Sequence, residues 1–566
     1  MRLVNVAYGV ILSSLLATAA PVHAAAAADL IVYNGKIFTA DSNSRGVQAL
    51  AVADGKFVDV GTSRSVLARD KGPKTKLLDL HGAFVSPGLT DDHFHNEGGG
   101  AGIDLSHART LDDLFAAVAA AARTAKPGAV IVSNSDWHEA QLKEQRLPTA
   151  IELDRVSPNN PVVLARGGHS LILNSAALKK WNITKATPVP AGGAISRDQS
   201  GELTGELFDN AKALVDLPPE APLSMADIMR TQKMLNEYGI TAVRIPGAYK
   251  GDLLSAYRLM KQARDAGTLT LRYIVYLPGF TLRSAEQARA LLAKWNVKQD
   301  EGDDWVRIGG VKLIVDGGFE GGHLSRPYQE PWGKGGTYSG LTVVPQANYT
   351  EVVRELNRLG WRPTTHAVGD AGIDEVLTAY SAANADQPIR GKRWAIEHAF
   401  VVRPEQLEKL EKLDVALSVQ DHLFLAAPVL KRYWGSDIAA HVTPLRTFEK
   451  SGLIVAGGTD SPVVPFNPFF ELYHFLTRDT MSDGVYGADE AVGSRSDLLK
   501  LITINYARLI GEQKHKGSIE PGKLADFAVL SNDFLTVPVK QIPQMKALAT
   551  YVGGREVYRD SNWSAR

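Results

Sequence analysis

The sequence predicts an α/β protein built on a (β/α)₈ barrel, with a small β-domain assembled from the two ends of the chain. Short apolar segments alternate with amphipathic helical segments from about residue 85 to residue 500. Alternation over this length is typical of parallel strands joined by helices, most often a barrel. Both ends of the chain instead carry short strand-like segments separated by glycine turns. Neither end is long enough to bury a sheet alone, so we expect them to pack together.

The first 24 residues have the pattern of a cleavable signal peptide. Arg2 is followed by the apolar stretch "VAYGVILSSLLATAA" and by the small-residue site "VHA" ending at Ala24. A membrane anchor is the alternative, but spanning a bilayer takes about 20 apolar residues and this stretch is shorter. We therefore expect a periplasmic or secreted protein that does not insert into the membrane after cleavage.

Residues 25–84 and 501–566 are predicted to form the two parts of a β-sandwich. The segments "DLIVYNGKIFTA" and "VQALAVADGKFVDVG" alternate apolar and polar residues around "NG" and "DG" turns. Near the other end, "GSIEPGKLADFAVLS" and "MKALATYVGGREVY" follow the same pattern.

Residues 85–500 supply the strands and helices of the predicted barrel. Strand-like segments include "TAVRIP", "LRYIVYL", "RIGGVKLIVDG", "RPTTHAV", "RWAIEHAF", "VALSVQ" and "LIVAGGTDS". Helical segments such as "YTEVVRELNRLG" and "PEQLEKLEKL" separate several of them. The rhythm breaks between about residues 105 and 214, which we interpret as an insertion after the first strand.

Composition narrows the classes of function. Lys plus Arg and Asp plus Glu both number 62, so no basic excess indicates a nucleic-acid partner. The chain has no cysteine. It therefore has no disulfide, and any metal must be bound by histidine, carboxylate or lysine-derived ligands. A small-molecule substrate is the expected partner, and the sequence leaves a homo-oligomer open.

Polar residues of the kinds that bind metals recur where the predicted strands end. His93 and His95 follow the first apolar segment, and four further residues lie in later strands: Lys312, His366, His398 and Asp460. Each has a plain structural alternative, since a histidine at a strand end is often only hydrogen-bonded and Asp460 could cap a helix. Active sites of barrels lie at the C-terminal ends of the strands. Six such residues at these positions together favour a metal site.

The spacing of the first histidines fits a strand that presents one face to a metal. Residues i, i+2 and i+4 of a strand share a face, so Asp91, His93 and His95 are predicted to point into the barrel. Neutral imidazoles bind Zn²⁺ and leave a position for water. The metal lowers the pKa of that water from 15.7 to roughly 7. Asp460 could accept the water's proton and pass it to a leaving amine.

These motifs resemble the amidohydrolase superfamily, and specifically its YtcJ-like (amidohydrolase 3) branch. "GAFVSPGLTDDHFH" resembles the HxH motif of the first strand, and "VKLIVDG", "THAVGD", "IEHA", "GTDSPV" and "GSIEPGKLADFAVL" match the branch in order. The insertion segments "RVSPNNPVVLARGGHSLILNSAAL" and "GELTGELFDNA" are similar too. The resemblance extends from about Ala28 to Tyr558. It implies a metal-dependent hydrolase on a distorted TIM barrel with a composite β-sandwich.

The resemblance also implies roles for individual residues. It assigns His93 and His95 to the more buried metal, and His366 and His398 to a second one. Lys312 would bridge the two Zn²⁺-type ions as a carbamate, because an ammonium would repel cations. Whether one or two ions bind stays open. Asp460 would be both a metal ligand and the catalytic acid–base.

A further group of residues is expected around this centre. His169 in "GGHS" resembles an insertion histidine that reaches the active site, with a structural loop residue as the alternative. His422 is a second candidate for substrate contact, and Asp91 and Gln420 are expected to orient the ligands from behind. Asp370 is predicted to cap a helix. The remaining candidates are aromatic or imidazole side chains that either line the pocket or only pack: Trp137, His138, Trp332 and Tyr338.

Some positions carry residues that differ from those usual in the branch. Thr90, Asp92 and Asn96 replace apolar or small residues around the HxH motif, and Asp421 stands where proline is common. These changes bear on substrate preference more than on metal binding. The predicted function is hydrolysis of an amide or other C–N bond by metal-bound hydroxide. Ester, lactone or carbamate hydrolysis is the alternative on the same site. A non-catalytic binding protein is disfavoured because Asp460 is present.

Overall fold

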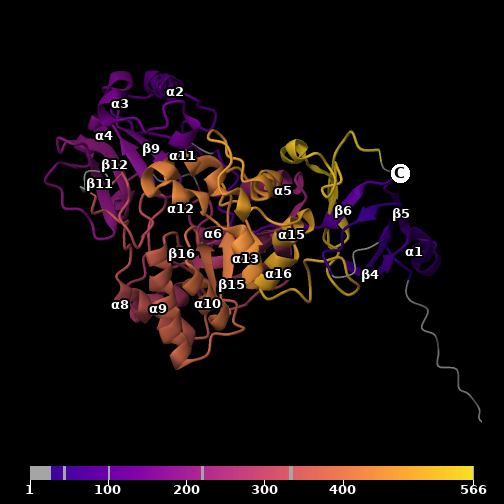
Figure 1. The fold of residues 1–566 in the computed structure, drawn as a ribbon. Coiled ribbons are helices and arrows are strands. Elements are labelled where there is room, and N and C mark those ends of the chain that lie inside the picture. Colours follow the sequence, from indigo (N-terminus) through magenta and orange to yellow (C-terminus); the bar gives the residue numbers. More distant parts are fainter. Residues whose placement is uncertain (1–26, 42–45, 100–101, 218–221, 331–335, 565–566) are drawn as a thin grey trace, which may run out of the picture.

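The structure is a computed structural model that describes residues 27–41, 46–99, 102–217, 222–330 and 336–564. The predicted signal peptide, residues 1–24, and Trp332 lie outside these ranges. Three bodies of secondary structure are visible along the chain (Figure 1). A central barrel lies between a sheet domain formed by residues 105–214 and a second sheet domain formed by the two chain ends.

Eight parallel strands of the described residues form the nearly closed barrel, which confirms the predicted fold. They are β7 (Leu89–Asp91), β13 (Ile240–Pro246), β14 (Arg272–Pro278), β15 (Val306–Ile314), β16 (Pro363–Ala367), β17 (Ala395–His398), β18 (Ala416–Val419) and β19 (Val455–Gly457). Neighbours in sequence are neighbours in the sheet. The two edge strands meet where Asp92 N donates to Gly457 O at 3.2 Å. Strands buried on both faces require nearly continuous apolar segments, which explains why β13 and β14 contain so few polar residues.

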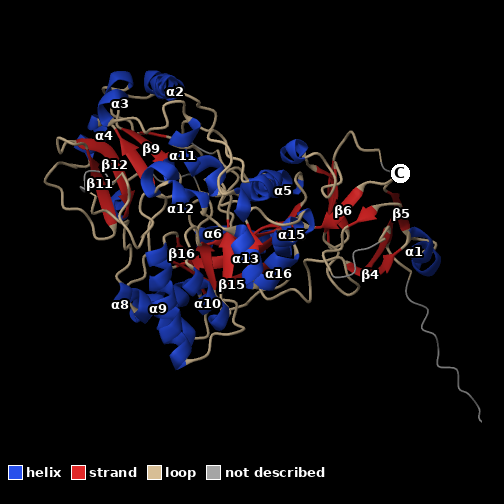
Figure 2. Ribbon diagram, in the orientation of Figure 1, coloured by secondary structure: helices blue, strands red, loops and turns tan. Residues whose placement is uncertain are grey.

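Helices cover the outside of the barrel, as Figure 2 shows by colour. They are α5 (Met225–Asn236), α6 (Leu253–Asp265), α7 (Ala285–Trp295), α8 (Gln346–Arg358), α9 (Asp370–Asp386), α10 (Pro404–Leu413), α13 (Leu445–Ser451), α14 (Pro468–Thr477), α15 (Arg495–Leu501) and α16 (Ile504–Leu509), with the 3₁₀ turn η3 (Ala488–Glu490). Helices α11 (His422–Trp434) and α12 (Ser436–Ala440) instead pack in a separate apolar cluster with Phe319 and Tyr338. In α8 the buried residues Tyr349, Val352, Val353 and Leu356 recur at helical spacing. That stripe packs against the barrel and leaves the charged face in water.

Residues 105–214 form their own five-stranded sheet in the order β11–β12–β10–β9–β8. Its strands are β8 (Ile131–Val132), β9 (Val162–Arg166), β10 (Ser170–Leu173), β11 (Gly193–Arg197) and β12 (Leu203–Asp209). The helices of this segment are α2 (Leu111–Thr124), α3 (Ala150–Val156) and α4 (Ser175–Lys180), with the 3₁₀ turns η1 (Glu139–Gln141) and η2 (Asn210–Leu214). The β9–β10 hairpin carries His169 at its tip.

Strands from both ends of the chain share one sheet, in the order β2–β6–β20–β21–β22. A second sheet, β4–β3–β1–β5, comes from the N-terminal part alone. The elements are β1 (Leu30–Tyr33), β2 (Lys36–Ile37), β3 (Ala49–Ala53), β4 (Lys56–Gly61), α1 (Ser63–Asp70), β5 (Lys76–Asp79), β6 (Phe84–Pro87), β20 (Phe527–Leu530), η4 (Val539–Gln544), β21 (Ala547–Val552) and β22 (Arg555–Arg559). Val32 and Leu50 of one sheet and Val529 of the other belong to one apolar core. The composite sandwich therefore closes only when both ends of the chain are present.

None of the helices in the described ranges combines the length and the apolar character needed to cross a membrane.

Candidate active site

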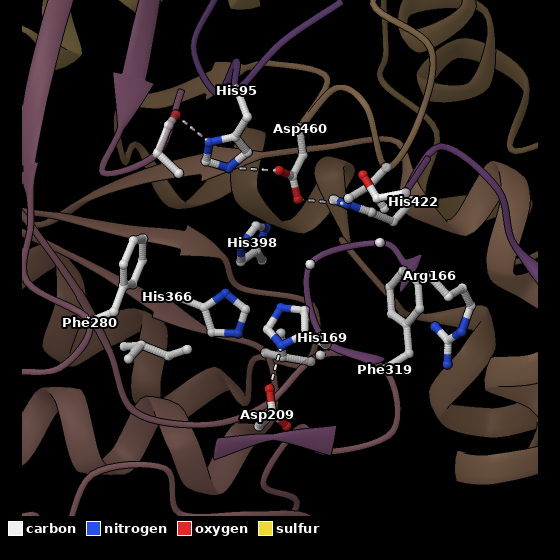
Figure 3. Close-up of a pocket in the computed structure, with 18 of the residues that line it drawn as sticks. His95, Arg166, His169, Asp209, Phe280, Phe319, His366, His398, His422 and Asp460 are labelled. Carbon is white, nitrogen blue, oxygen red and sulfur yellow. Dashed lines mark hydrogen bonds and ion pairs between the residues drawn. The ribbon is translucent and has the colours of Figure 1, made fainter. Parts of the chain in front are cut away.

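A cavity of about 480 Å³ lies where the C-terminal ends of the barrel strands meet the inserted sheet domain. All six residues predicted to bind metal line this cavity: His93, His95, Lys312, His366, His398 and Asp460. His169 and His422 line it as well. Figure 3 shows the labelled imidazoles and Asp460 facing the same space: His95, His169, His366, His398 and His422. The barrel thus brings together side chains that are far apart in the sequence.

The strand carrying the first histidines is shorter than predicted. β7 ends at Asp91, so His93 and His95 lie in the segment that follows it, held by an isolated bridge between Phe94 and Ser461. Both imidazoles still face the cavity, whereas Asp91 does not line it. Its carboxylate instead accepts hydrogen bonds from Thr459, at 2.6 Å from the hydroxyl and 2.9 Å from the backbone N–H. The prediction that Asp91 shares one face with His93 and His95 is therefore wrong, because its carboxylate is bound by Thr459 just beyond β19 and the two histidines lie past the end of β7.

Each of four imidazoles has one nitrogen engaged by an oxygen acceptor on its outer side. His93 Nδ1 lies 2.7 Å from Glu397, His95 Nδ1 2.9 Å from Ala248 O, and His398 Nδ1 2.7 Å from Gln420. His366 Nε2 lies 3.1 Å from Gly317 O.

An oxygen acceptor fixes the proton on the nitrogen that it faces, and the opposite nitrogen keeps its lone pair. Each of the four rings, all of which line the cavity, thereby keeps one nitrogen that is able to bind a metal ion.

The protonation states suit metal binding. Burial, followed by the nearby positive charge of Lys312, lowers the pKa of His93 to about 3. Burial also lowers the pKa values of His366 and His398 well below their usual range. Neutral imidazoles do not have to release a proton before they can bind a cation.

Asp460 lies at the centre of this group, just beyond β19. Its Oδ1 is 3.2 Å from His95 Nε2 and 3.5 Å from His93 Nε2, and its Oδ2 is 3.0 Å from His422 Nε2. Burial alone would raise the pKa of Asp460, but His93 and His422 beside it lower that pKa well below its usual range. The carboxylate is therefore ionised. The helix-cap alternative does not apply, because Asp460 has a φ of 56° and precedes no helix.

Lys312 projects from the interior of β15 and is only 2% exposed. Burial is the main cause that lowers its pKa to about 8. A lysine reacts with CO₂ only as the free amine, so this lowered pKa favours the carbamate expected from the family resemblance.

A buried ionic network lies on the side of the histidines away from the cavity. The sequence patterns did not indicate most of its members. Arg244 Nη1 and Nη2 each donate to Glu397 at 2.7 Å, and Arg244 Nε donates to Asp92 at 2.8 Å. Burial by itself would raise the pKa of Glu397, yet Arg244 and Lys312 lower it well below its usual range. The result is a charged acceptor fixed against His93. The sequence signal that could have indicated Glu397 is its position directly before His398.

His169 is held over the barrel by a residue that the sequence did not single out. Its Nδ1 lies 2.6 Å from Asp209 Oδ1, and its ring packs 5.1 Å from that of His366. Gly317, Gly318 and Gly321 in "DGGFEGG" leave space for this pair. A Cβ on Gly318 would lie 2.8 Å from the His169 ring, and one on Gly317 would lie 2.4 Å from Asp209 Oδ2. The barrel loop is thus shaped to receive the inserted hairpin.

Other predicted residues divide into two groups. Trp137 and His138 line the cavity, whereas Tyr338 does not and donates to Glu320 O at 2.6 Å.

The N-cap prediction for Asp370 is wrong by one residue. Gly369 is the cap of α9 in the extended conformation that the position requires, so Asp370 becomes the first helical residue. Its carboxylate accepts from Ser325 N and pairs with Arg403.

The donor set fits a divalent metal ion. His93, His398 and Asp460 each place one ligand atom within 4.8 Å of the others, and His366 lies beside His398 with ring centroids 4.5 Å apart. Imidazole nitrogens with carboxylate oxygens and no thiolate suit Zn²⁺-type ions.

Comparison with known proteins agrees with this geometry. The sequence model of the amidohydrolase family (amidohydrolase 3) matches residues 76–558. The chain belongs to the amidohydrolase family. This confirms the resemblance inferred from the motifs.

Relatives of this amidohydrolase extend over nearly its whole length. The protein LONG AFTER FAR-RED 3 of Arabidopsis thaliana is 32% identical over 551 residues, covering 94% of this chain and 92% of that protein. An N-substituted formamide deformylase of Arthrobacter pascens is 28% identical over 553 residues, covering 93% and 97%. The crystal structure of an uncharacterized metal-dependent hydrolase from Pyrococcus furiosus has a TM-score of 0.63 at 26% identity, covering 90% of this chain and 100% of that one. The amidohydrolase is thus a metal-dependent hydrolase on a TIM-like barrel.

Proposed function

We propose that this amidohydrolase cleaves an amide or other non-peptide C–N bond of a small molecule, with Asp460 as the general acid–base. The observation that carries the proposal is the position of Asp460. Its two oxygens lie 3.2 Å from His95 Nε2 and 3.0 Å from His422 Nε2 at the cavity wall. One carboxylate can therefore touch both the metal ligands and the reacting groups of a substrate.

Asp460 and the residues around it have separate roles in the proposed reaction. A divalent ion bound by His93, His95, His366 and His398 supplies Lewis-acid activation of water and of the substrate carbonyl. Asp460 takes the proton of the attacking water and delivers it to the leaving nitrogen. His422 Nε2 donates to Asp460 Oδ2 and holds the carboxylate in place.

We infer that the metal would be Zn²⁺, held as one or two ions, and that Lys312, as a carbamate, would supply oxygen ligands to them. Support comes from the nitrogen and oxygen donor set and from the lowered pKa of Lys312. Elemental analysis together with intact mass measured under CO₂-retaining conditions tests both points.

A substrate screen tests the proposed reaction. Protein loaded with Zn²⁺ is assayed with N-formyl amines, N-acyl amino acids, aryl amides and lactones. N-formyl amines come first because a relative of 28% identity is named as an N-substituted formamide deformylase. We expect amine release from at least one amide, and loss of that release in Asp460→Asn. Hydrolysis of lactones alone would replace the C–N proposal with the ester alternative.

We further propose that the protein is exported to the periplasm or secreted, because residues 1–24 have the pattern of a signal peptide. N-terminal sequencing of protein from the native cell envelope should begin near Ala25. An intact Met1 in the cytosolic fraction would contradict export.

A further inference from the structure

An aromatic wall leads from the proposed metal ligands to one end of the cavity, beside the inserted sheet domain. The ring of His398 lies 5.7 Å from Phe400, and Phe400 is stacked on Phe319 at 5.7 Å with 20° between the planes. Phe319 in turn lies 5.5 Å from His138. Phe319, Phe400 and His138 all line the cavity, together with Trp137. Aromatic faces bind planar or aromatic groups well, so this wall suits the body of an aromatic substrate.

A buried arginine closes this end of the cavity, next to Phe319 in Figure 3. Arg166 is 3% exposed, and two of its three guanidinium nitrogens face carboxylates. Nε lies 3.2 Å from Glu139, while Nη2 pairs with Glu320 and lies 3.9 Å from Glu206. The guanidinium is thus anchored on Glu320 through Nη2. Among the described residues, Nε lies near Glu139 without a hydrogen bond, and Nη1 is left without an acceptor.

His138 offers a second unused donor beside it. Its Nδ1 accepts a hydrogen bond from Ala140 N at 3.0 Å, so the proton of the neutral ring lies on Nε2. Nε2 is buried and has no hydrogen-bond partner among the described residues. A buried donor without an acceptor is costly, and a ligand oxygen placed there would remove that cost.

The charge around Arg166 decides what kind of acceptor fits. One guanidinium faces three buried carboxyl groups, Glu139, Glu206 and Glu320. Burial raises the pKa of Glu206 well above its usual range, so this group is protonated. Two further carboxyl groups, those of Glu139 and Glu320, still face the single guanidinium of Arg166. The more distant Arg432 forms an ion pair with Glu330 at 3.1 Å. The end of the cavity therefore has no uncompensated positive charge to attract an anion.

We propose that Arg166 and His138 form a subsite for a neutral hydrogen-bond acceptor, such as a ketone, amide or ether oxygen, on an aromatic group of the substrate. The bond to be cleaved lies at the other end, beside Asp460. This orientation rests on the proposed function, and the subsite itself rests on the two unused donors. A substrate carboxylate would meet Glu320, which lines the cavity, and a substrate ammonium would meet the N–H groups of Arg166 and His138.

The test uses N-benzylformamides and their longer N-phenethyl homologues, bearing hydrogen, acetyl, carboxylate or aminomethyl in the para position. Dissociation constants are measured by calorimetry on Zn²⁺-loaded Asp460→Asn, and kcat/KM on the wild-type protein. We expect an acetyl compound to bind about tenfold more tightly than its unsubstituted parent, the value of one good hydrogen bond. Carboxylate and aminomethyl compounds should bind no better than the parent.

Two substitutions at His138 separate a binding role from a structural one. His138→Asn can still accept from Ala140 N but places no donor at the Nε2 position, so the acetyl advantage should disappear. His138→Gln restores a donor near Nε2 and should retain much of the advantage. Arg166→Lys should reduce it too, because a single ammonium is drawn to the carboxylates. Arg272→Lys, at a buried arginine paired with Asp526 outside the cavity, is the matched control and should bind as the wild type does.

The subsite is refuted if acetyl gives no advantage in either series, if a carboxylate binds tenfold more tightly than acetyl, or if His138→Asn retains the acetyl preference. The binding order is measured without turnover, so it stands apart from the proposed reaction. That reaction would be overturned instead if no amide of the screen, formamides included, released an amine.

Discussion

Glu397→Gln removes the charge that orients His93 and leaves the shape of the side chain unchanged. In the wild type, Oε2 of Glu397 faces His93 Nδ1 and Arg244 Nη2, and Oε1 faces Arg244 Nη1 and the hydroxyl of Thr364. Both oxygens therefore accept from N–H groups. A glutamine must turn its own NH₂ toward one of these pairs, whichever way the amide is placed. The better placement keeps its oxygen at His93 and turns NH₂ toward Arg244 Nη1 and Thr364, whose hydroxyl can rotate to accept.

Two effects should follow. Breaking one arm of a buried ion pair costs about 3–5 kcal/mol of stability, and we expect about 3 kcal/mol because Asp92 still pairs with Arg244. Replacing the acceptor of a metal-binding histidine lowers metal affinity by about 10–100-fold. We expect about tenfold, or about 1.4 kcal/mol, because the hydrogen bond to His93 survives without its charge.

Competition with a chelator measures the affinity for Zn²⁺, and thermal unfolding of the metal-free protein measures stability. Glu512→Gln is the matched control, because Glu512 is a buried carboxylate paired with Arg307 and, at 2.5 Å, with Lys516. It does not line the cavity. The control should lower the unfolding temperature and leave Zn²⁺ affinity unchanged. If Glu397→Gln binds Zn²⁺ within twofold of the wild type, Glu397 supports only the fold and the assignment of His93 orientation to it is wrong.

Three further outcomes are expected. Asp460→Asn should lower kcat by about 10²–10⁴-fold, or about 3–5 kcal/mol at 1.36 kcal/mol per decade, with metal content and unfolding temperature nearly unchanged; a rate near that of the wild type would move the proton transfer to another group. His93→Ala combined with His95→Ala should lose at least one metal equivalent in elemental analysis, and full occupancy would show that the ligands are misassigned. Carboxylation of Lys312, followed by intact mass in bicarbonate, should increase as the pH rises from 6 to 8.5. The free amine becomes more abundant toward the lowered pKa of about 8; a modified fraction that falls over this range would contradict the carbamate.

Much of the fold and of the metal-binding set could be predicted because each signal is local. His366 and His398 end short apolar strands, and strand ends of a parallel barrel meet at one face. The misplacements were local as well. The strand stops at Asp91 although the residue pattern continues to His95, and the cap of α9 is Gly369 although aspartate is the commoner cap. Periodicity and residue preference do not state where a hydrogen-bond ladder ends.

The sequence by itself determined the barrel, the composite sandwich and the residues able to bind a metal. Only the tertiary structure decided what holds and surrounds those residues. Glu397 reaches His93 across 304 positions of sequence, and Arg166 reaches Glu320 across 154. Such partners have no spacing that a sequence pattern can reveal. They meet because barrel closure brings β7, β13 and β17 to one interior and because the inserted hairpin folds over it, where a low dielectric makes each buried charge depend on its partner.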